Sequence, residues 1–180
     1  MSTPVVVDSS VAVKWFTEPS ERGAAEAFAL LDKHRDRELM LVAPTHLRLE
    51  VLNALRFSGL TADERMAVSR DLEDFSLEWV ETSAGVASEA AGVALAHSLT
   101  IYDAVFVAVA LALDAELVTA DRAILRAEAC RLRALADSSR LAHPYLTRVN
   151  TAYWLSRSTS RKSSAIVSSN ASSTLRSSAG

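Results

Sequence analysis

Four acidic side chains occupy positions from which carboxylates could act together. Asp8 and Asp121 each directly follow an apolar run typical of a buried strand, and Asp103 lies in the first turn of an expected helix. Glu50 lies on the border of the apolar stripe of another expected helix, where an unpaired ionised carboxylate would be costly. If the fold gathers these acids, they repel one another unless cations or protons compensate them. Hard oxygen ligands of this kind suit Mg²⁺ or Mn²⁺.

Each of these acids also has a structural explanation. Asp103 fits the third position of a capping box, and Asp121 fits the N-cap of a helix. Asp8 could cap a short helix that follows it. Glu50 could extend to solvent or pair with Arg48 or a distant lysine. A purely structural role for all four together is less favoured than for any one of them, so we treat the four as one candidate site.

The apolar pattern predicts strands that alternate with helices, which is typical of an α/β domain with a mostly parallel sheet. We expect strands at about residues 5–7, 39–42, 77–81, 116–120 and 131–135. We expect helices at about residues 11–16, 20–35, 45–58, 61–75, 100–114 and 122–129, with an alanine-rich helix that ends near residue 97. Pro44 would lie in the first turn of one of them. Ligands bind beyond the carboxyl ends of the strands in such sheets, where Asp8 and Asp121 are expected.

Composition narrows the classes of protein that the chain can represent. It has 180 residues, of which 49% are hydrophobic and 23% charged, as in an ordinary globular domain. Its single cysteine, Cys130, and its scattered histidines give no disulfide framework and no zinc spacing. The longest apolar run, residues 104–113, is too short to cross a bilayer, and the N-terminus lacks the basic region of a secretory signal. We therefore expect a cytoplasmic protein without a membrane partner.

Charge and composition change towards the C-terminus. Residues 151–180 carry four basic residues and no acid, which leaves 15 basic against 22 acidic residues in positions 1–150. An acidic body argues against a general nucleic-acid coat protein, whose affinity comes from many Lys and Arg contacts to phosphate. From about residue 156 the chain is rich in serine and poor in large apolar residues, so we expect that segment to be disordered.

Four segments in this order resemble the motifs of PIN-domain ribonucleases, and within that family the VapC toxins of type II toxin-antitoxin pairs. They are residues 7–16 (VDSSVAVKWF), 49–55 (LEVLNAL), 101–104 (IYDA) and 117–121 (LVTAD). The resemblance covers about residues 4–137, so we assign residues 1–137 to a nuclease domain and residues 138–180 to a C-terminal extension. It implies a three-layer α/β fold with helices around a sheet of strand order 3-2-1-4-5.

The resemblance also implies an activity, a set of site residues and partners. Asp8, Glu50, Asp103 and Asp121 match the family's acidic metal-binding residues, of which we expect Asp8 and Asp103 to bind the metal directly. Supporting positions are Thr119, Ser9, Ser10 and Asn53, and candidate contacts to RNA are Lys14, Arg122 and Arg126. The implied reaction is Mg²⁺- or Mn²⁺-dependent hydrolysis of RNA phosphodiester bonds. The implied partners are an RNA substrate, a cognate antitoxin that blocks the site, and a second copy in a homodimer.

Two other functions stay open. The domain could keep its acids and act as a non-catalytic RNA-binding or scaffolding module, although inactive relatives usually lose one of the acids. A Mg²⁺-dependent phosphatase for small phosphate esters is less favoured, because Asp8 lacks a second aspartate two residues on. No glycine-rich phosphate loop supports binding of a dinucleotide or of a nucleoside triphosphate.

Overall fold

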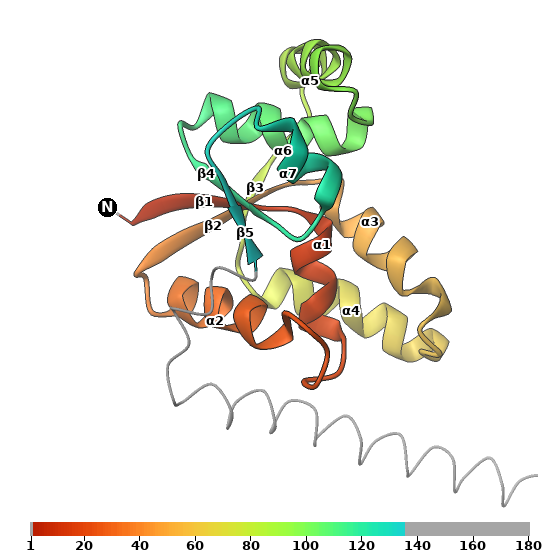
Figure 1. Cartoon of the computed structure of the whole chain (residues 1–180). Helices are drawn as coiled ribbons and strands as arrows, with labels where there is room; N and C mark the ends of the chain where they lie inside the picture. The colour runs from red at the N-terminus through yellow and green to blue at the C-terminus, as the bar shows by residue number, and fades with distance from the viewer. Residues whose placement is uncertain (1, 136–180) are drawn as a thin grey trace, which may run out of the picture. The chain divides into compact units, whose positions relative to one another are not determined.

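The computed structural model describes residues 2–135, and these form a five-stranded sheet with helices on both sides (Figure 1). The strands are β1 (Thr3–Val7), β2 (Leu39–Pro44), β3 (Glu78–Val80), β4 (Glu116–Thr119) and β5 (Leu132–Ala134). Their order is β3-β2-β1-β4-β5, and every neighbouring pair is parallel. This confirms the expected α/β class and strand order. The predicted domain end at residue 137 and the serine-rich extension lie outside the described residues.

The helices connect successive strands of the sheet. They are α1 (Ser9–Ala12), α2 (Ala24–Arg35), α3 (Leu47–Ala54), α4 (Ala62–Asp74), α5 (Ala84–His97), α6 (Ile101–Ala112) and α7 (Arg122–Ala127), with short 3₁₀ helices η1 (Val13–Phe16) and η2 (Leu55–Phe57). In Figure 1, α1, α2 and α4 lie on one side of the sheet, whereas α6 and α7 lie on the other. Because α1 begins two residues after β1 and α7 begins three residues after β4, the N-terminal ends of these helices lie at the carboxyl ends of the two strands.

The core forms where the central strands meet the helices. In β1, the segment Val5–Val7 is buried, as expected for a strand covered on both faces. The segment Ala104–Ala110 of α6 is also fully buried, which explains its unbroken apolar sequence. On the other side, the Trp15 indole N–H donates a 2.9 Å hydrogen bond to the carbonyl of Ala27. Its ring packs edge-on against Phe75, with ring centroids 5.5 Å apart.

The structure differs from the sequence prediction at several element boundaries. Pro44 ends β2 instead of opening a helix, and the Thr45 N–H continues the pairing with a 3.0 Å bond to the Val80 carbonyl. Since proline has no N–H, the end of a strand is a place where the sheet tolerates it. The helix expected from residue 20 begins only at Ala24, after Gly23 takes a φ of 86°. Such a conformation interrupts a helix and suits glycine.

No single helix in residues 2–135 is long and apolar enough to span a bilayer. The pair α5 and α6 would meet those requirements only if joined across a bend of 111°.

Candidate functional site

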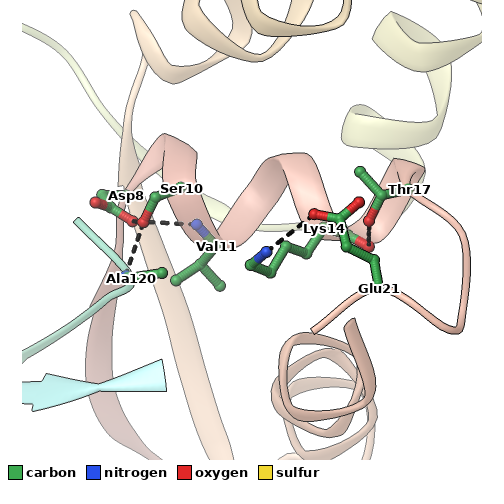
Figure 2. A network of polar contacts seen from close by, with 7 residues as sticks. All are labelled: Asp8, Ser10, Val11, Lys14, Thr17, Glu21 and Ala120. Atoms are coloured by element: carbon green, nitrogen blue, oxygen red, sulfur yellow. Dashed lines mark hydrogen bonds and ion pairs between the residues drawn. The ribbon is translucent and has the colours of Figure 1, made fainter. Parts of the chain in front are cut away.

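Asp8 is the most completely enclosed acid of the candidate site. It directly follows β1, caps α1, and is only 2% exposed. One carboxylate oxygen, Oδ1, accepts hydrogen bonds from the Ser10 hydroxyl at 2.7 Å and from the Val11 N–H at 3.2 Å (Figure 2). The other, Oδ2, accepts a 2.6 Å bond from the Thr119 hydroxyl. Burial raises the pKa of Asp8 to about 6, although these hydrogen bonds oppose the shift.

Two hydroxyl groups join the ends of β1 and β4. The Thr119 hydroxyl, fully buried at the end of β4, accepts the N–H of Asp121 at 2.8 Å. The Ser10 hydroxyl accepts the N–H of Ala120, also at 2.8 Å. Each hydroxyl therefore accepts a hydrogen bond from a backbone N–H just after the end of β4 and donates a hydrogen bond to the Asp8 carboxylate. The Asp8 carboxylate is thus oriented by groups from both strands.

Asp121 and Asp103 begin helices, as the sequence indicated. The Asp121 carboxylate caps α7 by accepting the N–H groups of Ala123 at 2.6 Å and Ile124 at 3.2 Å. At the start of α6, the Thr100 hydroxyl accepts the N–H of Asp103 at 3.1 Å and donates to its carboxylate at 2.7 Å. Both carboxylates therefore make local hydrogen bonds at the start of their helices, and this does not exclude a further role in an acid cluster.

Glu50 lies on α3 with one carboxylate oxygen unsatisfied. Its Oε2 is buried and has no hydrogen-bond partner within residues 2–135. Burial raises the pKa of Glu50, a hydrogen bond with the Ser9 side chain opposes this, and the charge of Asp103 adds to the rise. The alternative pairing with Arg48 is not formed, because Arg48 binds Glu73 at 2.6 Å. An orphaned buried carboxylate oxygen is a position that a cation or an ordered water can satisfy.

Ser9 and its neighbours connect the four acids. Asp8 is electrostatically coupled to Asp121, and Glu50 to Asp103. Ser9, which binds Glu50, directly follows Asp8 in the chain, so the two acid pairs meet at the first turn of α1. These contacts join the acids in two pairs, and a shared role for all four stays a prediction.

The donor chemistry of this edge fits a hard divalent cation, but the side chains are not arranged as a preformed metal site. Within residues 2–135, no three His, Cys, Asp or Glu side chains lie in an arrangement that could hold a metal ion. Carboxylates repel one another, and here Asp8, Asp103 and Asp121 accept hydrogen bonds from hydroxyl or backbone groups. The unsatisfied Oε2 of Glu50 and the buried Asp8 are groups that bound Mg²⁺ would stabilise in their ionised forms.

Three of the predicted supporting or RNA-contacting residues lie apart from these hydrogen bonds. Asn53 is exposed on α3 and accepts a hydrogen bond from Arg56. The Lys14 ammonium group lies 3.2 Å from a carboxylate oxygen of Glu21 (Figure 2). Arg122 is exposed at the start of α7. Their roles toward the site stay predictions.

One aromatic side chain near the acids, His46, was not predicted from the sequence. His46 precedes Glu50 by one helical turn, and both of its ring nitrogens are buried without a hydrogen-bond partner in the described part of the chain. Burial lowers the pKa of His46, and the nearby Tyr102 backbone and then the charge of Asp103 oppose this shift. Its ring centroid lies 4.8 Å from that of Phe106 and 6.1 Å from that of Tyr102. The four-residue spacing from Glu50 was the sequence signal that could have indicated His46.

The parallel sheet, the acids at its carboxyl edge and a family model agree on the class of protein. Residues 5–130 match the PIN domain, and the chain belongs to that family. PIN domains are typically nucleases, and such nucleases generally use Mg²⁺. No curated protein matches the chain in sequence.

Solved structures support the same fold. The crystal structure of PAE2754 from Pyrobaculum aerophilum is 27% identical, with a TM-score of 0.57, and the match covers 79% of this chain and 98% of that one. VapC20 from Mycobacterium tuberculosis, described as a sarcin-ricin-loop-cleaving toxin, is 13% identical with a TM-score of 0.56, over 69% of this chain and 95% of that one. VapBC2 from Rickettsia felis, bound to a promoter DNA fragment, is 14% identical with a TM-score of 0.56, over 73% and 98%. The similar structures therefore include toxins of toxin-antitoxin systems.

Proposed function

We propose that this PIN-domain protein is a metal-dependent endoribonuclease that acts as the toxin of a toxin-antitoxin pair. The observation that carries the proposal is the buried Asp8 carboxylate, which Thr119 and Ser10 orient at the edge where Glu50, Asp103 and Asp121 also lie. Buried carboxylates are costly, and a site that gathers several of them is typical of cation-assisted phosphate chemistry. The resemblance in fold to VapC20, described as a sarcin-ricin-loop-cleaving toxin, supports the choice of substrate.

The chain's own residues would position the reacting groups. Asp8 and Asp103 would hold Mg²⁺ or Mn²⁺, with Glu50 and Asp121 completing the set. When bound, the metal lowers the pKa of a water and stabilises charge on the scissile phosphate and the leaving oxygen. The Thr119 and Ser10 hydroxyls keep the Asp8 carboxylate in one orientation, as their hydrogen bonds show. Glu50 Oε2 has no competing hydrogen bond in residues 2–135, which is consistent with its proposed place in the metal-holding set.

Partners and location follow from the same proposal. Structures of FitAB and VapBC2 bound to DNA fragments are among those similar to this chain, which supports a cognate antitoxin as its partner. A basic side chain of the antitoxin would suit the acidic edge of the sheet electrostatically. We further propose a homodimer that acts in the cytoplasm, where its RNA substrate is found.

The metal requirement can be tested without knowing the RNA target. Calorimetric titration with Mn²⁺ should show binding to the wild type and its loss in Asp103→Asn. Asp114→Asn is the matched control, because Asp114 follows the opposite end of α6 and pairs with Arg131 at 3.2 Å. This variant removes the same charge and should bind Mn²⁺ like the wild type.

Cleavage of ribosomal and total cellular RNA should depend on the same residues as Mn²⁺ binding. Asp8→Asn and Asp103→Asn should lose cleavage while they keep the wild-type circular dichroism spectrum. Asp114→Asn should cleave normally. Equal Mn²⁺ binding or equal cleavage by the wild type and Asp103→Asn would contradict the proposed site. RNA binding without cleavage or Mn²⁺ binding would favour the non-catalytic module instead.

A further inference from the structure

One exposed aromatic ring lies directly beside the candidate site. Of the large hydrophobic side chains that are exposed within residues 2–135, two are aromatic: Tyr102, 65% exposed, and Phe57, 85% exposed. Tyr102 immediately precedes Asp103 in the first turn of α6, whereas Phe57 lies in η2, beyond the end of α3. An exposed aromatic ring next to an acid cluster is a feature that neither capping nor core packing requires.

Tyr102 packs against the ring of His46, which in turn packs against the ring of Phe106. The ring centroids of His46 and Tyr102 are 6.1 Å apart, with the ring planes at 47°. The ring centroids of His46 and Phe106 are 4.8 Å apart, with the planes at 52°. Phe106 lies one helical turn after Tyr102 on α6 and is only 1% exposed. These three residues form what we call the aromatic column, which runs from the core to the surface. Packing of Tyr102 against His46 would reduce the entropy that the exposed ring loses when a flat ligand stacks on it.

The aromatic column lies near two of the acids, because His46 contacts Tyr102 and the charge of Asp103 affects the pKa of both His46 and Glu50. His46 and Glu50 are separated by four residues and therefore lie on the same side of α3. Tyr102 and Asp103 are adjacent at the start of α6. A polynucleotide whose phosphate lies against the acids would thus have its neighbouring base within reach of the Tyr102 ring.

We propose that Tyr102 is the stacking platform for an unpaired nucleobase next to the scissile phosphate, with His46 and Phe106 as its support. The inference rests on the proposed function and specifies its substrate as single-stranded RNA at this position. Bases of unpaired RNA are recognised mainly by stacking on aromatic side chains, and such stacking tolerates different bases. Tyr102 would therefore contribute affinity and the choice of unpaired RNA more than a preference for one sequence.

The test compares two ligands that differ only in their bases. One is a fluorescein-labelled oligouridylate of about ten nucleotides, and the other is an abasic ribose-phosphate chain of the same length. Binding to the full-length protein is followed by fluorescence anisotropy in Mg²⁺ at low salt, with the integrity of both ligands checked on a gel. Tyr102→Leu should bind the oligouridylate about tenfold more weakly than the wild type and the abasic chain equally well. Tyr102→Phe should bind both ligands like the wild type, because it keeps the ring.

Phe57→Leu is the matched control, since it removes an exposed aromatic ring away from the acids and should bind both ligands normally. Circular dichroism should show that all variants are folded. The inference is overturned if Tyr102→Leu binds oligouridylate as tightly as the wild type. This holds also if the substitution changes only the oligomeric state of the protein and leaves binding unchanged. Equal weakening towards both ligands would also overturn it. If the wild type binds both ligands equally, the stacking role of Tyr102 is contradicted, but the proposed phosphate-binding site is not. If the wild type binds neither ligand, the proposed function is contradicted as well.

Discussion

The Thr119 hydroxyl donates a 2.6 Å hydrogen bond to the Asp8 carboxylate, although the two residues are 111 positions apart in the chain. They meet because β1 and β4 are neighbours in the sheet, with Val7 paired to Val118. Each residue follows its paired valine directly, so the parallel register itself places the hydroxyl beside the acid. Thr119 also accepts the N–H of Asp121, which makes it the connection between two of the candidate acids.

Removal of this hydroxyl should alter both the stability of the domain and the acidity of Asp8. Thr119→Val removes the partner of the Asp121 N–H and of Asp8 Oδ2, so we expect a loss of about 1–3 kcal/mol in the free energy of unfolding, measured with urea. Since the Thr119 hydrogen bond lowers the pKa of Asp8, its loss should raise that pKa further, as followed by NMR of the carboxyl carbon. Thr119→Ser should retain the wild-type pKa, and a similar rise in both variants would contradict the role of the hydroxyl.

Asp8 should make the stability of the metal-free protein depend on pH. Its pKa is raised from 3.8 to about 6 in the folded state, so the folded protein binds more protons than the unfolded chain between these values. The protonated form therefore contributes stability at low pH, and up to about 3 kcal/mol is lost as pH rises through 6. Asp8→Asn lacks this titration.

Urea unfolding in a chelator can isolate the contribution of Asp8. We expect the stability of Asp8→Asn, measured relative to the wild type, to increase between about pH 4.5 and about pH 7.5. A difference between the two proteins that is the same at both values would show that Asp8 titrates normally in the folded state.

Bound metal should stabilise the folded protein at neutral pH. A ligand that binds only the folded state adds about 2.7 kcal/mol at one hundred times its dissociation constant. Mn²⁺ should therefore raise the thermal unfolding midpoint of the wild type, measured by calorimetry, and should have little effect on Asp103→Asn. Asp114→Asn should respond like the wild type, and an equal response of Asp103→Asn would exclude Asp103 from the metal site.

Two glycines should respond oppositely to the same substitution. Gly23 has a φ of 86°, and an added Cβ would lie 3.1 Å from Lys14 Cε and 3.2 Å from Leu135 Cδ2. Gly23→Ala should therefore cost at least about 1–2 kcal/mol in unfolding free energy. Gly92 lies within α5 with nothing within 4 Å of the same position, so Gly92→Ala should add about 0.5–1 kcal/mol. Equal effects in urea denaturation would contradict this account of Gly23.

Much of the local structure was predictable because residues close in the chain determine it. The apolar run around Val5–Val7 indicated a buried strand, and Asp103 and Asp121 were expected at the starts of helices, where they lie. The boundary at Pro44 was wrong, since apolar pattern alone does not show where a strand ends. The order of the strands came from the motifs that resemble PIN domains, and the sheet confirms it.

The sequence by itself determined which elements form, which acids follow the strands, and which family the motifs resemble. Only the tertiary structure decided that Thr119 binds Asp8, that Lys14 pairs with Glu21, and that His46 supports Tyr102. The physical reason is the range over which each effect acts. Helix caps and apolar periodicity depend on neighbours within a few residues, whereas these contacts depend on strand register, on loop paths and on how helices pack across the sheet.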